Sequence, residues 1–245
     1  MNLNFSGIAA TSLLGRALRL PLRLIPPTTV LPILQGPLRG LKWVTGSALH
    51  GAWLGSYELR QQLAIAATLR PGTRFWDLGA HVGLYTLLAA RICGPENVLA
   101  IEPLPRNRAA IEKHLTLNRM SNVTILEGAV GRAPGEMMFE DAPSTSMGRL
   151  TPQGTRPVRV YSIDALVAQG EPAPDVIKCD IEGGEFEALQ GAIQTLRTHH
   201  PKIFLSFHER KIQQDCCALL ADLGYNLLPQ DGYPLHETSE ILATV

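Results

Sequence analysis

The strongest constraint on the fold is a rhythm that starts at residue 73, where short apolar segments alternate with longer helical segments. The expected strands are Thr73–Leu78, Asn97–Ile101, Asn122–Val130, Asp175–Cys179 and Lys202–Phe207. The expected helices are Gly83–Ile92, Arg106–Asn118, Glu185–Thr198 and Lys211–Leu223, with a β excursion over 136–161 and two closing strands after Tyr225. Strands that alternate with helices of this length form βαβ units. The sequence therefore predicts an α/β fold with a doubly wound, mainly parallel sheet.

The first 70 residues differ in charge from the rest of the chain. They hold seven of the 22 Lys and Arg residues and one of the 22 acids, Glu58, which gives +6. Residues 71–245 hold the other 15 and 21, which gives −6. Two helices are expected here: a basic amphipathic one over Thr11–Leu24, and one over 52–69 that ends at Pro71-Gly72. We interpret 1–70 as a basic, partly helical appendage, either a cofactor lid or a docking segment. Docking on the main domain is favoured over peripheral contact with a membrane.

Composition excludes several classes of protein. Hydrophobic residues make up 45% of the chain, which is too much for a disordered protein. No apolar stretch approaches the roughly 18 residues of a membrane span. Four cysteines without a CxxC pair suit a reducing compartment, so we expect a cytoplasmic protein. The density of basic and aromatic residues is too low for a nucleic-acid partner, and a homo-oligomer stays open.

A Gly-rich turn follows the first expected strand of the sheet. It reads D-x-G-x-x-x-G from Asp77 through Gly79 to Gly83, and Glu102 stands 25 residues after Asp77, at the end of the second strand. A dinucleotide fingerprint would require glycines at 81 and 84, where this sequence has histidine and leucine. The pattern instead suits S-adenosylmethionine, with Asp77 complementing its positive end and Glu102 accepting both ribose hydroxyls.

Several motifs together resemble the FkbM family of class I S-adenosylmethionine-dependent methyltransferases, from about residue 36 to 230. They are Gly55-Ser56-Tyr57-Glu58, the Asp77–Thr86 loop, Ile101-Glu102-Pro103, Ala129-Val130-Gly131, and Ile177–Glu185, which matches K-x-D-x-E-G-x-E. The resemblance implies a Rossmann-like, seven-stranded sheet with a reversed C-terminal hairpin, a methyltransferase domain over 71–245, and O-methyl transfer. The sequence departs from the common pattern at His81, usually Asn, and around Phe207-His208-Glu209.

The turn and the resemblance together give a set of expected cofactor-binding residues. They are Glu58, Asp77, Gly79, Ala80, His81, Gly83, Tyr85, Glu102, Pro103, Ala129 and Asp180.

Asp180 and His208 are the expected catalytic residues. They close two expected strands, and adjacent strands lie about 4.8 Å apart, so both side chains can reach one pocket. A sugar hydroxyl is a weak nucleophile, and histidine is the usual general base. Asp180, Glu182 and His208 also form an oxygen-rich set that suits Mg²⁺. Structural alternatives are that Asp180 binds amides of the Gly183-Gly184 turn, that His208 only pairs with a carboxylate, and that Glu182 caps a helix.

The function expected from these residues is S-adenosylmethionine-dependent methylation of a hydroxyl on a sugar, oligosaccharide or polysaccharide. Two alternatives stay open: a non-sugar natural product as the acceptor, or a non-catalytic cofactor-binding scaffold that its basic front end recruits to a membrane or complex.

Overall fold

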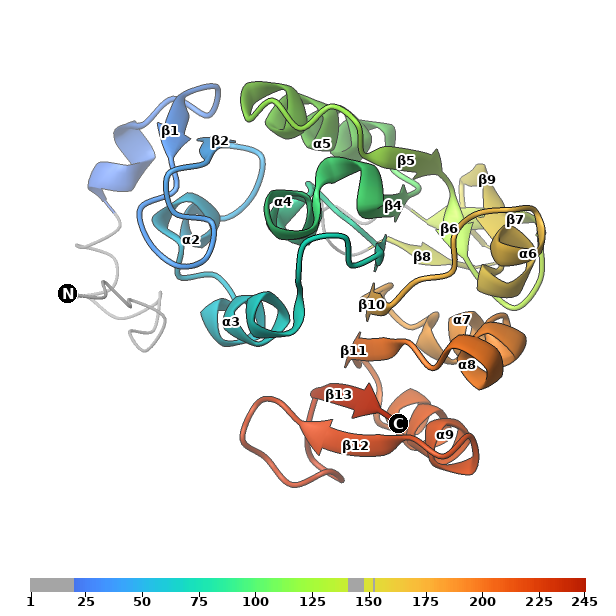
Figure 1. Ribbon diagram of the computed structural model, residues 1–245. Coiled ribbons are helices and arrows are strands. Elements are labelled where there is room, and N and C mark those ends of the chain that lie inside the picture. The colour runs from blue at the N-terminus through green and yellow to red at the C-terminus, as the bar shows by residue number, and fades with distance from the viewer. Residues whose placement is uncertain (1–19, 141–147, 152) are drawn as a thin grey trace.

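The computed structural model describes residues 20–140, 148–151 and 153–245. Its centre is a seven-stranded sheet with the order β12-β13-β11-β10-β3-β4-β5 (Figure 1). These strands are β3 (Phe75–Leu78), β4 (Val98–Glu102), β5 (Thr124–Glu127), β10 (Val176–Cys179), β11 (Lys202–Ser206), β12 (Asn226–Pro229) and β13 (Glu240–Thr244). Only β13 runs antiparallel to its neighbours β11 and β12 within this sheet. The expected seven-stranded sheet with a reversed C-terminal hairpin is confirmed.

Helices cover both faces of the sheet because successive strand residues point in opposite directions. Phe75 packs among α3 (Leu59–Thr68), α4 (Leu84–Cys93) and α5 (Pro105–Leu117). The next residue, Trp76, packs on the other face. That face carries α6 (Ile163–Ala168), α7 (Glu185–Gln190), α8 (Ile193–His199) and α9 (Arg210–Asp222). Figure 1 shows α4 and α5 on one side of the sheet and α7, α8 and α9 on the other.

The β excursion forms a separate four-stranded sheet with the order β6-β9-β7-β8. Its strands are β6 (Ala129–Val130), β7 (Gly135–Glu140), β8 (Arg149–Leu150) and β9 (Arg156–Tyr161). The single strand expected over 122–130 is wrong: it divides at Gly128 into β5 and β6, which belong to different sheets. A Cβ at Gly128 would lie 2.5 Å from the carbonyl oxygen of Arg159, so the chain needs glycine where it leaves the large sheet. The small sheet therefore starts at the carboxyl edge of the large one.

Two expected helices are also divided. The helix over 52–69 is α2 (His50–Leu54) and α3, separated at Gly55, where φ is 74° and a Cβ would lie 2.2 Å from the Gln35 oxygen. The helix over 185–198 is α7 and α8, separated at Gly191. The structure also contains α6, a short helix that the sequence pattern did not predict and whose first turn is capped by the Ser162 hydroxyl. At Gly55 and Gly191 a close contact with a distant part of the chain overrides the helical pattern.

A buried histidine on α5 joins the described part of the N-terminal region to the main domain. A two-stranded hairpin of β1 (Val30–Pro32) and β2 (Lys42–Val44) lies against α5. The Val44 amide donates to His114 Nε2 at 3.2 Å, and His114 Nδ1 donates to the Val82 oxygen at 2.9 Å. The ring of Trp43 stacks on His114 at 3.9 Å between centroids. Burial lowers the pKa of His114 to about 4, which fits a neutral ring that accepts at Nε2.

Most of the basic amphipathic helix expected over Thr11–Leu24 lies outside the described residues. Its last four residues, Pro21–Leu24, form the 3-10 turn η1. Within the part of the chain that the structure describes, no helix has the length and apolar character needed to cross a membrane.

Candidate active site

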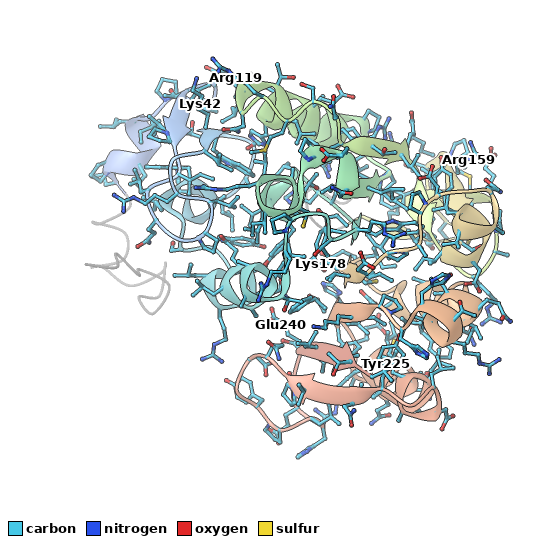
Figure 2. All side chains as sticks on the ribbon, in the orientation of Figure 1. Lys42, Arg119, Arg159, Lys178, Tyr225 and Glu240 are labelled. Atoms are coloured by element: carbon cyan, nitrogen blue, oxygen red, sulfur yellow. The ribbon has the colours of Figure 1, made fainter. Side chains whose placement is uncertain are left out.

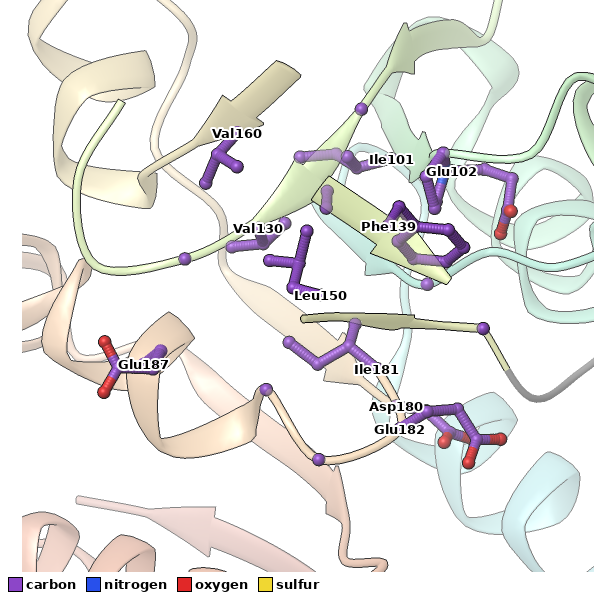
Figure 3. Close-up of a pocket in the computed structure, with 18 of the residues that line it drawn as sticks. Ile101, Glu102, Val130, Phe139, Leu150, Val160, Asp180, Ile181, Glu182 and Glu187 are labelled. Carbon is purple, nitrogen blue, oxygen red and sulfur yellow. The ribbon is translucent and has the colours of Figure 1, made fainter. Parts of the chain in front are cut away.

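A cavity of about 900 Å³ opens at the carboxyl ends of β3, β4, β10 and β11, beneath the small sheet (Figure 3). Ligands of open α/β sheets bind at this edge. The sequence-predicted residues that line the cavity are Glu58, Gly79, His81, Glu102, Pro103, Ala129, Asp180, Glu182 and His208. Four others, Asp77, Ala80, Gly83 and Tyr85, do not line it. The structure therefore brings most of the expected cofactor, catalytic and metal residues into one space.

The turn after β3 brings two strand ends into contact. Gly79 has φ of 79°, and a Cβ there would lie 2.1 Å from the carbonyl oxygen of Asp180 at the end of β10. His81 also adopts a left-handed conformation, with φ of 51°. Asparagine tolerates that conformation better than most residues, so the structure gives a physical reason for the family's usual Asn. The buried Nε2 of His81 has no hydrogen-bond partner.

Glu102 ends β4 and is 4% exposed. Its Oε2 accepts from the His81 amide at 2.8 Å, and its Oε1 accepts from the Leu104 amide at 2.9 Å and from Asn107 Nδ2 at 3.1 Å. A carboxylate offers about four acceptor positions, so one position on Oε2 stays open. Burial raises the pKa of Glu102 to about 7, against the opposing effect of its three donors.

Asp77 lies beneath the turn instead of facing the cavity. It is 1% exposed, its Oδ2 accepts from the Thr86 hydroxyl at 2.6 Å, and its Oδ1 has no partner. Burial raises the pKa of Asp77 to about 6, although the nearby ammonium of Lys178 lowers it. Asp77 is therefore not among the residues that line the cavity, and its direct contact with the positive end of a cofactor stays a prediction.

Lys178 is a buried cation that sequence analysis did not single out. It lies at the centre of the molecule (Figure 2), is 2% exposed, and its Nζ is 2.7 Å from Asp180 Oδ2. Burial opposes its charge, but the carboxylates of Asp180 and Asp77 outweigh this and raise the pKa of Lys178. The pKa of Asp180 is lowered: burial works against its charge, and Lys178 overcomes it. The i, i+2 spacing of lysine and aspartate in K-x-D is the signal for this pair, since such residues share a strand face.

Glu58 and Tyr57 bring the N-terminal region to the same cavity. Both residues line it, and Glu58 stands in a left-handed conformation with φ of 46° immediately before α3. The hydroxyl of Tyr85 donates to Glu58 Oε2 at 2.6 Å. Burial, followed by the Glu58 charge, raises the pKa of both tyrosines, which keeps their hydroxyls protonated. Tyr85 does not line the cavity itself, but its hydrogen bond holds the Glu58 side chain in place.

His208 lies between three carboxylates at the other end of the cavity. Its Nε2 is 3.4 Å from Asp180 Oδ1 and 3.4 Å from Glu182 Oε2, and its Nδ1 is 3.0 Å from Glu185 Oε1. The hydrogen bond with Glu185 is the main reason that the pKa of His208 rises to about 9. One ligand atom from each of Asp180, Glu182 and His208 lies within 4.8 Å of the others, a spacing that could hold a metal ion. The predicted metal set is therefore assembled as a group.

Glu185 is the residue that orients this cluster, and sequence analysis placed it only as part of the family signature. It is fully buried, and its Oε1 accepts from the Gly183 amide at 3.1 Å as well as from His208. The Gly183 amide therefore donates to Glu185. The alternative in which Asp180 accepts from this turn is not what the structure shows for that amide. No sequence signal pairs Glu185 with His208, because the two residues come from different βα connections.

The polar groups that line the cavity fit S-adenosylmethionine. Glu102 keeps an open acceptor position for a ribose hydroxyl, and the orphaned Nε2 of His81 offers a further polar contact. The carboxylates of Glu58 and Asp180 suit the cationic end of the molecule. The Asp180, Glu182 and His208 atoms also fit a divalent cation in ligand type, because Mg²⁺ prefers carboxylate oxygens.

Comparisons with known proteins agree with this geometry. The sequence profile described as Methyltransferase FkbM domain matches residues 77–241. A protein of Haloferax volcanii named hexuronic acid methyltransferase AglP is 28% identical over 151 residues. That match covers 60% of this chain and 61% of the Haloferax protein, so the two share about three fifths of their lengths.

A solved structure shows the same fold. The crystal structure of Methyltransferase FkbM from Methylobacillus flagellatus KT superposes with a TM-score of 0.53 at 19% sequence identity. The superposition covers 80% of this chain and 53% of that one, so this chain spans about half the length of the Methylobacillus protein.

Proposed function

The chain belongs to the FkbM family of S-adenosylmethionine-dependent methyltransferases, and from that premise we propose that it methylates a hydroxyl group of a carbohydrate. One observation carries the proposal. The turn around Gly79 and the carboxylate of Glu102, which suit the cofactor, share a single cavity with the cluster of Asp180, Glu182 and His208. A scaffold that only bound the cofactor would not need a histidine held between three carboxylates.

In this proposal the cofactor supplies a methyl group that its sulfonium already activates. Glu102 binds a ribose hydroxyl through its open position on Oε2, and Gly79 and Ala129 allow close approach of the backbone. Glu58 and Asp180 place negative charge toward the cationic end. The protein's remaining tasks are to align the acceptor oxygen and to accept its proton.

His208 is the residue we assign to the acceptor proton. Its Nδ1–H points at the buried Glu185, which fixes the tautomer and leaves Nε2 as the acceptor facing the cavity. At Nε2 it would take the hydroxyl proton, and the imidazolium so formed would lie between Asp180 and Glu182, each 3.4 Å away. The hydrogen bond with Glu185, followed by the charges of Asp180 and Glu182, raises the pKa of His208 to about 9, so the base is strong but mostly protonated at neutral pH.

A divalent cation at the same three residues is the alternative way to activate the acceptor. Two carboxylates and Nε2 converge there, and either a proton or a cation relieves their mutual repulsion. Mg²⁺ held by Asp180, Glu182 and His208 would lower the pKa of a bound hydroxyl.

The name of one relative supports the choice of a carbohydrate acceptor. The similar protein of Haloferax volcanii is named for a hexuronic acid, which is a sugar. We also propose that residues 1–70 act as a cofactor lid through their described part, since Tyr57 and Glu58 line the cavity.

Two experiments test these assignments. Isothermal titration with S-adenosylhomocysteine should show one tight site per chain, strongly weakened by Glu102→Ala, and tighter binding of NAD would contradict the cofactor. Labelled S-adenosylmethionine should transfer its label to carbohydrates in an acceptor screen. Labelling of a phenol or a protein, with sugars unlabelled, would replace the proposed acceptor. Loss of activity with a chelator and its recovery with Mg²⁺ would select the cation over the free base.

A further inference from the structure

The charge of the cavity is unevenly distributed. Six of the residues that line it are acidic: Glu58, Glu102, Asp180, Glu182, Glu187 and Glu209. Among the described lining residues, Arg132 is the single lysine or arginine. An acceptor that carries a negative group is therefore repelled from the end at Asp180 and attracted to the end at Arg132. This polarity would orient such an acceptor with its uncharged hydroxyls toward His208.

Arg132 already holds a carboxylate in the geometry that a ligand would use. Its Nε and Nη2 each donate to one oxygen of Glu187 at 3.0 Å, which is a planar two-point contact. The side chains of Arg132 and Glu187 are 57% and 51% exposed. An ion pair this exposed to solvent contributes little to stability, so a bound carboxylate can displace Glu187 at little cost.

The backbone of Arg132 is fixed relative to the reaction cluster by α7. A Cβ at Gly191, just after this helix, would lie 2.2 Å from the Gly131 oxygen and 3.0 Å from the Arg132 oxygen. The helix begins at Glu185, which holds His208. A helix of this length spans about 9 Å. Arg132 and His208 are therefore anchored at the two ends of one short helix.

The space between these ends is lined by apolar side chains. In Figure 3, Val130, Leu150 and Ile181 lie between Glu187 on one side and Asp180 and Glu182 on the other. Carbon–hydrogen faces of a sugar ring pack on such a wall, whereas a charged group there would be left without a partner. Among the side chains that the structure describes around the cavity, the Arg132 guanidinium is thus the favourable position for the negative group of an acceptor.

We propose that Arg132 is a specificity-determining residue that binds the carboxylate of a sugar acid, with Glu187 occupying its place when no acceptor is bound. The inference rests on the proposed function, which it deepens by naming an acidic carbohydrate as the acceptor class. Glu187 then acts as an internal competitor. Removal of its charge and removal of the Arg132 charge must change acceptor affinity in opposite directions.

The test measures binding, so that it does not depend on turnover. Glucuronic and galacturonic acid, with glucose and galactose as neutral counterparts, are titrated into protein saturated with S-adenosylhomocysteine. Arg132→Gln should weaken binding of at least one acid about tenfold or more and leave the neutral sugars unchanged. Glu187→Gln should strengthen binding of the same acid. Arg74→Gln is the matched control, because Arg74 pairs with Asp175 at 3.5 Å with 47% and 50% exposure, at the opposite edge of the sheet.

The outcomes separate this inference from the function on which it rests. The inference is overturned if neither acid binds, if acids and neutral sugars bind alike, or if Arg132→Gln changes nothing. Methyl transfer to neutral sugars in that case would leave the proposed function standing. Conversely, acid binding that depends on Arg132, with no carbohydrate methylated in the labelled screen, would support the carboxylate site and remove the carbohydrate methyltransferase.

Discussion

Two carboxylates, Glu102 and Asp180, stand at strand ends on different sides of the cavity, and their surroundings shift their pKa values in opposite directions. Glu102, the last residue of β4, accepts hydrogen bonds from three uncharged donors, and burial raises its pKa to about 7. Asp180, after β10, is held by the buried ammonium of Lys178, and its pKa is lowered. One carboxylate can gain a proton near neutral pH, while the other keeps its charge.

This difference shows how one sheet edge supports two kinds of recognition. A carboxylate among amides is suited to accept hydrogen bonds from neutral hydroxyls. A carboxylate that pairs with a buried lysine stays ionised, and the lysine balances its charge within the protein interior. Four experiments test this difference between Glu102 and Asp180.

The largest expected effect is at the charged end. His208→Ala should lower kcat by about 10²–10⁴-fold, because the acceptor loses the group that takes its proton. Affinity for S-adenosylhomocysteine should stay nearly unchanged, since His208 lies away from Glu102. Steady-state rates with labelled cofactor and calorimetric titration measure the two quantities. Full activity that a chelator does not affect would contradict both the base and the cation.

The second effect concerns Lys178, which keeps Asp180 ionised. Lys178→Met leaves Asp180 and Asp77 without their buried partner, so the free energy of unfolding should fall by about 3–5 kcal/mol. Chemical denaturation measures it. Lys211→Met is the matched control, since Lys211 pairs with Asp215 at the same 2.7 Å but is 76% exposed. It should change stability by less than about 1 kcal/mol. Equal losses in the two variants would show that Lys178 has no special role.

The third effect is on the neutral end. Because the pKa of Glu102 is about 7, lowering the pH from 8 to 6 protonates it, and S-adenosylhomocysteine affinity should fall by up to about tenfold. The dependence should vanish in Glu102→Gln, whatever its absolute affinity. For stability the sign is reversed: the contribution of this raised pKa is lost as pH rises from the unfolded value through 7. A pH-independent wild-type affinity would rule out titration of Glu102 over this range.

The smallest effect is a shift in a pH profile. The pKa of His208 is about 9, and the neutral ring is the base, so kcat should rise with pH toward 9. Its charged form stabilises the fold below the unfolded pKa, and this contribution is lost as pH rises through 9. Glu185→Gln removes the main cause of the shift and should lower the midpoint by about one pH unit. Exposed Glu112→Gln is the control, and an unmoved midpoint in Glu185→Gln would assign the profile to another group.

The fold was largely predictable from the sequence because alternating strands and helices leave a local pattern. Features that depend on contacts between distant residues were not predicted. The break at Gly191 depends on contact with Gly131, which lies 60 positions earlier in the chain. The site shows the same division. The predicted cavity residues follow individual strands, whereas the position of Asp77 and the contact of Glu185 with His208 depend on how separate units pack. The pair of Lys178 and Asp180 differs from these two cases. Its i, i+2 spacing on one strand is a local signal in the sequence, although the pairing was not predicted.

The pairing of β3 with β10 has a consequence for how the chain reaches its active form. Asp77 stands opposite Lys178 in the sheet, with the whole of β4, β5 and the small sheet between them in sequence. Strand pairs this distant in sequence carry a large loop-closure cost and tend to form slowly. The cavity does not exist until that step is complete, because Gly79 and Asp180 meet there. We therefore expect the Asp180 side of the cavity to form only after distant parts of the chain have paired. The donors to Glu102 come from His81, Leu104 and Asn107, so that carboxylate can be held within the first half of the chain alone.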